Sequence, residues 1–397
     1  MEINRIETWI EEMICSLERW FSQRDYWYIE CNHVPECLLG KKPRVNMLLR
    51  TIYRLNPINL RPQASMDACP LTPQTQVALL KAYNLSGHVG IVRYIYKRVF
   101  ELISPQTRNF ALKQGIRISI NLYENSPETP TPLNTVWFGQ FLLDTEDRII
   151  PKAQKQNLLL SICRYLVEEL GYQDYGGQGV YFYYGPTLTK VIYNASALIS
   201  AFLLRVGHIY SMKEYSDLGF RGISYIVNNQ NEDGSWFYAA PPERSSIDCF
   251  HQSYVLQALH SAKEFSPELV SDAIRRGEDY YRSMFVRKGN YIIPIRYDKR
   301  FTPHNTWLFQ KLDGRDIGEA LIYFSRYSYD QQMLEGLLTY LYQEMYLPKR
   351  GYIAPEIFIY GRNRIPYSEF QAWYLYALYV VQSTIKAKQN EGDIHIS

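Results

Sequence analysis

The strongest constraint on the fold is a repeat of about 60 residues that runs through most of the chain. Apolar residues recur at helical spacing in six segments, whose first residues lie between 51 and 66 positions apart. A second helical segment follows each of the first five, and residues 6–21 are a further predicted helix that supplies the twelfth. The first segments are 71–86, 133–143, 192–205, 250–262, 316–326 and 367–382, and the second segments are 89–103, 152–170, 213–229, 267–285 and 331–346. Each period therefore holds two helices.

The segment after the second helix repeats as well. In four periods it joins a turn glycine to a short aromatic or β-branched run, at Gly179, Gly234, Gly289 and Gly351. Helix pairs with recurrent loops on one side are typical of an open solenoid or of a closed ring, and about six pairs favour the ring. We therefore predict an all-α fold, a single (α/α)6 toroid. Inner helices surround a central cavity, outer helices shield them, and short aromatic hairpin-like loops lie at one end.

The toroid is predicted to be one domain. The Pro-rich stretch 125–132 lies inside the repeating region, so we interpret it as a long connection within the toroid and not as a domain boundary. Residues 1–43 are predicted to form an N-terminal helix and a lead-in segment that packs on the ring. Residues 44–386 form the toroid and residues 387–397 a polar tail.

Composition and charge exclude several classes of protein. The 43 Lys and Arg residues nearly balance 40 Asp and Glu residues, and no window concentrates the basic ones, so we expect no nucleic-acid partner. No apolar run approaches the roughly 18 residues of a membrane span, and the N-terminal segment 1–24 lacks the apolar core of a signal peptide. The six scattered cysteines indicate reduced thiols. These features predict a cytoplasmic protein with no membrane span.

Tyrosine is unusually frequent, with 35 Tyr residues beside 17 Phe and 7 Trp. A buried phenol needs a hydrogen-bond partner, so an ordinary core takes Leu, Ile and Phe more readily, and the excess is predicted to line a site. Aromatic side chains with hydroxyl tips suit the apolar C–H faces and the hydroxyls of sugars. Loop packing is the alternative for each of them. The predicted stacking residues are Tyr181, Tyr183, Tyr184, Tyr193, Trp236 and Tyr238.

Two sets of motifs resemble known toroid families. The run Gln-Asn-Glu-Asp-Gly-Ser-Trp at 230–236 resembles the Gln-and-Trp repeat of the squalene cyclase and prenyltransferase-like toroids, where the turn ties one outer helix to the next inner helix. An ordered set of motifs resembles a group of bacterial toroid proteins encoded among cell-surface polysaccharide genes. The motifs are Ile-Asn-Leu-Arg-Pro at 58–62, Tyr-Asn-Ala at 193–195, Asp-Gly-Ser-Trp at 233–236, Ile-Asp-Cys-Phe-His at 247–251, Ile-Pro-Tyr at 365–367 and Gln-Ala-Trp at 371–373.

This resemblance covers residues 44–382 and implies a setting in polysaccharide or glycoconjugate biosynthesis. The sequence departs from the group at two places. No His stands near Gly318, and Ser-Glu-Phe at 368–370 replaces the expected Arg-Trp. A changed substrate and a lost activity are both consistent with these departures.

Polar residues at the starts of the inner helices are the candidate site, because in such a ring they converge at the mouth of the cavity. Asp248 and His251 are three residues apart on one helical face, as are Asp316 and Glu319, and either pair could position a general acid or base. The alternatives are an N-cap role for Asp248, a core role for His251, and exposed helix-start acids at 316 and 319. The predicted binding residues are Tyr183, Tyr193, Asn194, Trp236, Tyr238, Gln252, Tyr367, Glu369 and Trp373, with Asn134, Trp137 and Gln371 at equivalent positions.

No metal or cofactor is predicted. Cys31, His33 and Cys37 offer three zinc-type ligands, but no fourth is evident nearby and the spacing is not that of a known knuckle. The glycines at 176–179 lack the Lys-Ser/Thr and the strand-to-helix context of a phosphate loop. The acids stand on separate helices without clustered histidines.

The sequence thus favours a carbohydrate-active toroid enzyme that cleaves, eliminates or epimerises within a glycan or glycoconjugate. Convergent acids and aromatic loops support this hypothesis. Two alternatives stay open: a non-catalytic glycan-binding or assembly protein, and a terpenoid or peptide cyclase-like enzyme that shares the ring.

Overall fold

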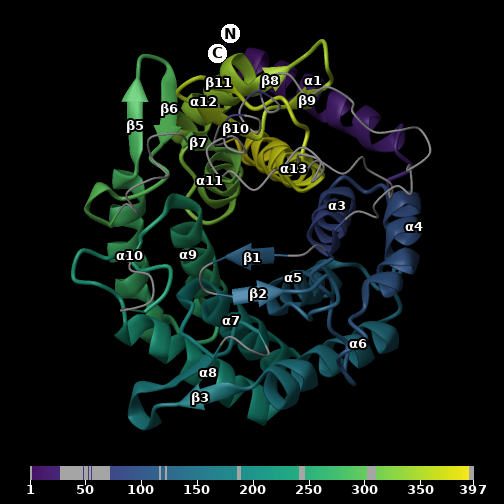
Figure 1. Cartoon of the computed structure of the whole chain (residues 1–397), viewed down its shortest axis with the longest axis vertical. Coiled ribbons are helices and arrows are strands. Elements are labelled where there is room, and N and C mark those ends of the chain that lie inside the picture. Colours follow the sequence, from purple (N-terminus) through teal and green to yellow (C-terminus); the bar gives the residue numbers. More distant parts are fainter. Residues whose placement is uncertain are drawn as a thin grey trace. The chain divides into compact units, whose positions relative to one another are not determined.

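Helices make up most of the structure. The computed structural model describes residues 2–26, 48, 52, 55, 72–115, 118–120, 123–185, 189–240, 246–301 and 310–392 (Figure 1). The helices are α1 (Glu2–Ser22), α3 (Pro73–Leu85), α4 (Val89–Val99), α5 (Pro132–Asp144), α6 (Lys152–Arg164), α7 (Tyr193–Ile209), α8 (Lys213–Asn228), α9 (Cys249–Lys263), α10 (Pro267–Ser283), α11 (Gly314–Arg326), α12 (Gln331–Tyr340) and α13 (Ser368–Glu391).

Every helix predicted from the apolar period is confirmed, and most boundaries agree within a few residues. The second helices of two periods end in a wider helical turn, at Tyr165–Leu170 and Leu341–Met345. None of the described helices combines the length and the apolar character that crossing a bilayer requires.

The described residues fall into two compact units, each treated separately below. The central unit comprises residues 72–286 and 295–303, and the terminal unit comprises 1–71, 287–294 and 304–397. Helices α3 to α10 belong to the central unit. Helices α1, α11, α12 and α13 belong to the terminal unit.

Burial alternates between the two helices of a pair. In α7, 14 of 17 residues are buried, whereas in α8 only seven of 16 are, on one face. The helices α3, α5, α9, α11 and α13 follow the first pattern, and α4, α6 and α10 follow the second. A helix buried around its circumference belongs to an inner layer, and an amphipathic helix covers it from outside.

Helices α7 and α8 pack side by side at very short range (Figure 1). Gly219 of α8 faces the α7 backbone so closely that an added Cβ would lie 2.4 Å from the Leu204 nitrogen. Gly90 of α4, in contrast, has no atom within 4 Å of such a Cβ.

These two glycines give a matched pair of stability predictions. Gly219→Ala should lower the free energy of unfolding by about 1–3 kcal/mol because the extra methyl overpacks a rigid backbone contact. Gly90→Ala should raise it by about 0.5–1 kcal/mol through helix propensity alone. Denaturant unfolding of both variants measures the difference. Equal effects in the two variants would contradict the close packing of α7 on α8.

Short strands follow the outer helices and form small sheets. Most of them pair as hairpins, and β7, β10 and β11 form a three-stranded sheet in the order β11-β10-β7. The strands are β1 (Ile118–Ile120), β2 (Tyr123–Asn125), β3 (Tyr172–Asp174), β4 (Val180–Phe182), β5 (Phe285–Lys288), β6 (Tyr291–Pro294), β7 (Gln310–Asp313), β8 (Tyr346–Leu347), β9 (Tyr352–Ile353), β10 (Glu356–Phe358) and β11 (Gly361–Arg362).

The turn glycines predicted from the repeat adopt the left-handed conformation that a side chain disfavours. Gly234 has φ +89°, and a Cβ there would lie 2.2 Å from the Arg276 carbonyl oxygen. Gly179, Gly289 and Gly351 also have positive φ. These glycines turn the chain from an outer helix into the extended run that leads to the next inner helix.

The fourth residue of an inner helix holds this extended run in four of the repeats. Gln252 accepts from the Trp236 N–H at 3.0 Å and donates to its carbonyl at 2.6 Å, and Gln371 does the same with Ile353 at 3.0 and 2.8 Å. We call this contact the inner-helix clasp. Its other two members use a hydroxyl: Ser196 accepts from Phe182 N–H, and Thr135 accepts from Leu112 N–H.

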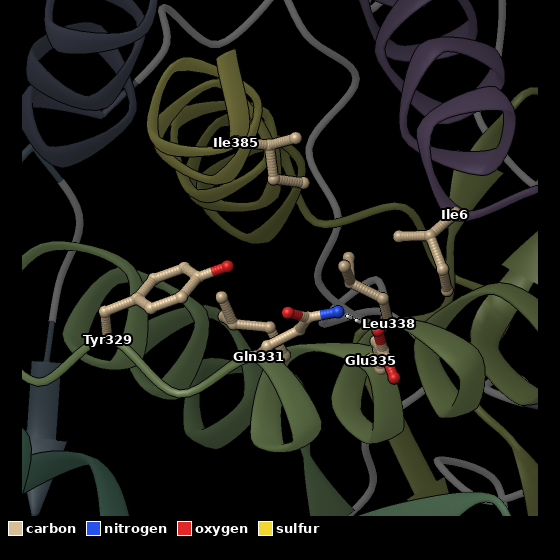
Figure 2. A pocket seen from close by; sticks show the side chains of 7 residues that line it. Ile6, Tyr329, Gln331, Glu335, Leu338 and Ile385 are labelled. Carbon is tan, nitrogen blue, oxygen red and sulfur yellow. Dashed lines mark hydrogen bonds between the residues drawn. The ribbon is translucent and has the colours of Figure 1, made fainter. Parts of the chain in front are cut away.

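Helix α1 packs against α12 and α13 within the terminal unit. The indole of Trp9 stacks on Tyr342 with a centroid distance of 4.6 Å. Figure 2 shows a small hollow that these three helices share, with aliphatic side chains on most sides and a Gln331–Glu335 hydrogen bond of 2.9 Å. The hollow presents no convergent acids, so it does not have the lining expected for sugar chemistry.

Candidate functional site

Asp248 and His251 form a hydrogen-bonded pair at the start of α9. Asp248 is the N-cap of this helix, and its Oδ1 accepts from the backbone N–H of His251 at 3.2 Å. Its Oδ2 lies 2.6 Å from Nδ1 of the His251 imidazole. The predicted N-cap role of Asp248 is confirmed, and the second carboxylate oxygen contacts His251, so the cap is compatible with the predicted site role.

The carboxylate fixes the state of the imidazole. A carboxylate can only accept, so Nδ1 of His251 carries a proton, and exchange of a proton with a substrate would take place at Nε2. The side chain of His251 is 17% exposed, whereas that of Asp248 is 3% exposed. The buried Asp248 carboxylate thus orients an imidazole that is partly accessible to solvent.

Arg296 is a third member of this group, and it is not among the residues predicted from the sequence. Its Nη1 donates to Asp248 Oδ1 at 3.2 Å, and its guanidinium lies 4.4 Å from the centroid of Phe250. The segment that carries it is fixed to the helix start, because Cys249 N–H donates to the Arg296 carbonyl at 3.1 Å. The sequence signal for Arg296 is its place directly after the apolar run 291–295, which suggests burial. A buried Arg is almost always paired with an acid.

Charge around Asp248 outweighs the effect of its burial. Burial alone would raise the pKa of the Asp248 carboxyl, but His251 and Arg296, together with the hydrogen bonds from His251, hold that pKa well below its usual range. Asp248 is therefore ionised at every pH at which the protein would work.

This shift predicts a loss of stability in acid. A carboxyl with a lowered folded-state pKa contributes stability above its unfolded pKa of about 3.9, and the contribution is lost as the pH falls through and below that value. The variant Asp248→Asn keeps an N-cap residue and removes the charge. The difference in free energy of unfolding between wild type and Asp248→Asn should therefore narrow as the pH falls from about 5 to 3. A difference that stays constant down to pH 3 would contradict the pairing of the Asp248 carboxylate with His251 and Arg296.

Aromatic rings surround the imidazole. The centroid of the His251 ring lies 4.0 Å from that of Phe250, 4.6 Å from that of Tyr238 and 5.9 Å from that of Tyr254. The centroids of Tyr254 and Trp137 are 5.7 Å apart. All four aromatic side chains are buried. They limit the access of water to the charged pair, and a low local dielectric strengthens its interactions.

The start of α7 reaches the same region through Tyr238. The backbone N–H of Tyr193 donates to the Tyr238 carbonyl at 3.3 Å, while the Tyr238 ring contacts His251. Asn194 is buried, and within the described part of the chain neither atom of its side-chain amide has a hydrogen-bond partner. A buried amide normally finds one, so Asn194 stays a candidate for binding a polar group of a ligand.

Tyr183 lies in a cluster of tyrosines beside α7 and α8. Its ring lies edge-on to that of Tyr181 with a centroid distance of 5.7 Å, and its hydroxyl donates to Gln173 at 3.5 Å. Tyr225 links this cluster to Tyr193 with a centroid distance of 6.4 Å. Burial, which is the larger cause, and the neighbouring tyrosines raise the pKa of Tyr225, so its hydroxyl stays protonated at neutral pH.

Two of the predicted binding residues make contacts that hold the fold. Trp236 is fully buried, its indole N–H donates to the Ile226 carbonyl at 2.9 Å, and its ring packs against Gly277. No face of this side chain is left for a sugar. Gln252 uses both ends of its amide in the inner-helix clasp on Trp236, so it holds the loop.

Asp316 and Glu319 lie at the start of α11 in the terminal unit. Both are fully buried, so the alternative of exposed helix-start acids is wrong. Glu319 accepts a hydrogen bond from the indole N–H of Trp373, which is a predicted binding residue and is itself buried. A Cβ added at Gly318 would lie 3.1 Å from the Trp373 ring, which leaves little room there for the expected histidine.

Two further predicted binding residues lie at the start of α13. Tyr367 and Glu369 are half-buried, and the Tyr367 ring lies 5.9 Å from Phe370. The structure thus gathers Asp248, His251 and Tyr238 in the central unit, and Asp316, Glu319 and Trp373 come from the terminal unit.

The described residues contain no group of three His, Cys, Asp or Glu side chains that could hold a metal ion. Cys31, His33 and Cys37 lie outside the described residues, as do residues 58–62.

In sequence, no family model and no curated protein matches the chain. Solved structures resemble it in fold. A family 76 glycoside hydrolase from Bacteroides thetaiotaomicron, a mannosidase, has a TM-score of 0.57 at 10% identity, over 97% of this chain and 100% of that one. A cellobiose 2-epimerase from Bacillus thermoamylovorans has a TM-score of 0.58 at 8% identity, over 79% and 88%. An unsaturated glucuronyl hydrolase specific for heparin has a TM-score of 0.51 at 15% identity, over 79% and 86%.

These likenesses show the fold. The chain has the (α/α)6 toroid fold, and the predicted fold class is confirmed. At identities of 8–15% they do not extend to the activity.

Proposed function

We propose that the chain is an enzyme that acts on a glycan or glycoconjugate, with His251 as the group that transfers a proton. The observation that carries this proposal is the buried Asp248 carboxylate, which orients a partly exposed imidazole at 2.6 Å. The similar structures support the substrate class, since a mannosidase, an epimerase and a glucuronyl hydrolase use the same fold for sugars. The resemblance at 233–236 and 247–251 supports a setting in polysaccharide biosynthesis.

The geometry around Asp248 favours one kind of reaction. Hydrolysis by two carboxylates needs one carboxylate that protonates the leaving oxygen and another that attacks or activates water. Asp248 is held by Arg296 and His251 and is shielded from solvent, so it is not placed to attack. Nε2 of His251 can instead remove a proton from a sugar carbon beside a carbonyl or carboxyl group, and the imidazolium that forms can give a proton to the leaving oxygen in an elimination or back to the carbon in an epimerisation. We therefore place elimination or epimerisation ahead of hydrolysis.

Incubation in deuterium oxide with a panel of oligosaccharides tests this function. The panel contains a mannan, a polyuronate and an N-acetylated oligosaccharide, and proton NMR follows the products. Proton abstraction should give an epimer or an unsaturated sugar, and an epimer should carry solvent deuterium at one carbon. New reducing ends without deuterium or unsaturation would instead indicate hydrolysis and point to Asp316 and Glu319. Binding of a panel member without any product would support a non-catalytic glycan-binding protein.

A further inference from the structure

A hollow distinct from that in Figure 2 lies in the terminal unit, where the β8–β9 and β10–β11 hairpins meet. It is a hollow with a volume of about 440 Å³, within the range of small-molecule sites. None of the residues considered for catalysis lines it. The lining residues are Leu55, Leu347, Tyr360, Gly361, Arg362 and Arg364, and we call this site the arginine hollow.

Hydrogen bonds fix the two hairpins to each other at the edge of the arginine hollow. The hydroxyl of Tyr352 donates to the Arg364 carbonyl at 2.6 Å and accepts from Arg350 Nη1 at 3.2 Å. Gly361, at the tip of β10–β11, has φ +138°, which a residue with a side chain rarely adopts. The tip therefore sets Tyr360 and Arg362 in a defined conformation on either side of the glycine.

Positive charge is in excess at this site. Lys349, Arg350 and Arg364 are exposed and Arg362 is half-buried. Within residues 344–364, all of which are described and which comprise the two hairpins and their flanks, these four cations stand beside two carboxylates. Glu344 accepts from Arg362 Nη2 at 3.1 Å, and Glu356 accepts from Asn363 at 2.8 Å. The bond to Glu344 uses one of the five N–H donors of Arg362, so the guanidinium retains the capacity to bind a further anion.

An aromatic ring stands beside the guanidinium groups. Tyr360 stacks on Phe358 with a centroid distance of 5.0 Å and an interplanar angle of 3°. This support holds the ring in place while the side chain stays half-exposed. A fixed aromatic face beside two arginines matches a pyranose that carries an acidic group, because the sugar C–H face stacks and the anion pairs.

We propose that the arginine hollow binds an anionic sugar residue. Arg362 and Arg364 pair with its carboxylate, sulfate or phosphate group, and Tyr360 stacks on its ring. The site is separate from the proton-transfer residues, so binding there does not depend on whether His251 is catalytic. In a glycan-acting enzyme it would hold an acidic unit of the same polymer.

Calorimetry with the full chain tests the proposal with four probes: a tetragalacturonate, a heparin tetrasaccharide, mannose 6-phosphate and the neutral mannotetraose. The wild type should bind at least one of the three anionic probes at least tenfold more tightly than mannotetraose, and the preference should shrink at high salt. The probe that binds most tightly identifies the acidic group. Binding with no preference for acidic sugars would overturn the proposal.

Variants assign the binding to this hollow. The double variant Arg362→Gln/Arg364→Gln should bind the acidic probe at least tenfold more weakly. The control Arg275→Gln/Arg287→Gln removes two exposed charges on α10 and β5 and should leave the affinity for this probe unchanged. An equal loss of affinity in both double variants would show that net charge alone causes the loss, which would contradict the proposal. Tyr360→Ala should weaken the acidic sugar but not inorganic sulfate, and an unchanged sugar affinity would mean that the hollow binds bare anions only. His251→Ala should bind like the wild type, so a failure of the catalytic proposal is seen separately.

Discussion

Replacing His251 by Ala is expected to lower turnover of the glycan substrate by about 10²- to 10⁴-fold, the range that one general acid or base supplies. The free energy of unfolding should fall by no more than about 1–2 kcal/mol, because Asp248 keeps its ion pair with Arg296 when the imidazole is removed. Steady-state kinetics and denaturant unfolding of the same preparations measure the two effects.

The same helix offers a control for this substitution. His260 lies near the other end of α9. Its imidazole has a pKa lowered to about 4, mainly because the ring is buried. His260→Ala should leave turnover close to that of the wild type. Asp248→Asn should lower turnover as well, because an amide no longer fixes the proton on Nδ1. Loss of folding in His251→Ala, or equal kinetic losses in both histidine variants, would mean that His251 is a packing residue.

Replacing Trp236 by Ala should reduce the free energy of unfolding by about 3–5 kcal/mol, the cost of truncating a large buried aromatic side chain. The structure gives the reason: the indole is fully buried, packs against Gly277 and donates to the Ile226 carbonyl. Chemical denaturation monitored by circular dichroism measures the change.

Trp236→Phe provides the comparison, because it keeps most of the buried volume and loses the indole hydrogen bond and part of the ring packing. Its loss should be clearly smaller than that of Trp236→Ala. If Trp236→Ala instead keeps the stability of the wild type and raises KM, the side chain contacts substrate and does not support the fold.

The helices were predictable because their signal is local and repeats. Apolar spacing located α7 and α9 within a few residues, since inner and outer helices of each pair differ in which faces they bury. The pair Asp248 and His251 was predictable for the same reason: three residues apart on one helix, they meet without any knowledge of the tertiary structure.

Side-chain direction in the loops was not predictable in this way. Trp236 follows a turn glycine, and the turn indicates an extended run without indicating which side faces the core. Arg296 lies 48 residues from its partner Asp248, so the ion pair depends on how a later loop returns to α9. The burial of Asp316 and Glu319 likewise depends on the packing of α11 against α13. Charged residues at a helix start look the same in sequence whether solvent or another helix covers them.

The inner-helix clasp has a consequence for how such proteins diversify. Each clasp fixes an extended run to the fourth residue of the next inner helix, so the loop between them is anchored at both ends by contacts that do not involve its own side chains. The four loops are 113–131, 183–192, 237–248 and 354–367, and they differ nearly twofold in length although the clasp always comes from the fourth residue of the helix. Lengthening an anchored loop costs little, about 0.6 kcal/mol for each doubling. Insertions and exchanges in these loops can thus create new specificities on an unchanged helical scaffold, which makes them the positions of choice for loop grafting.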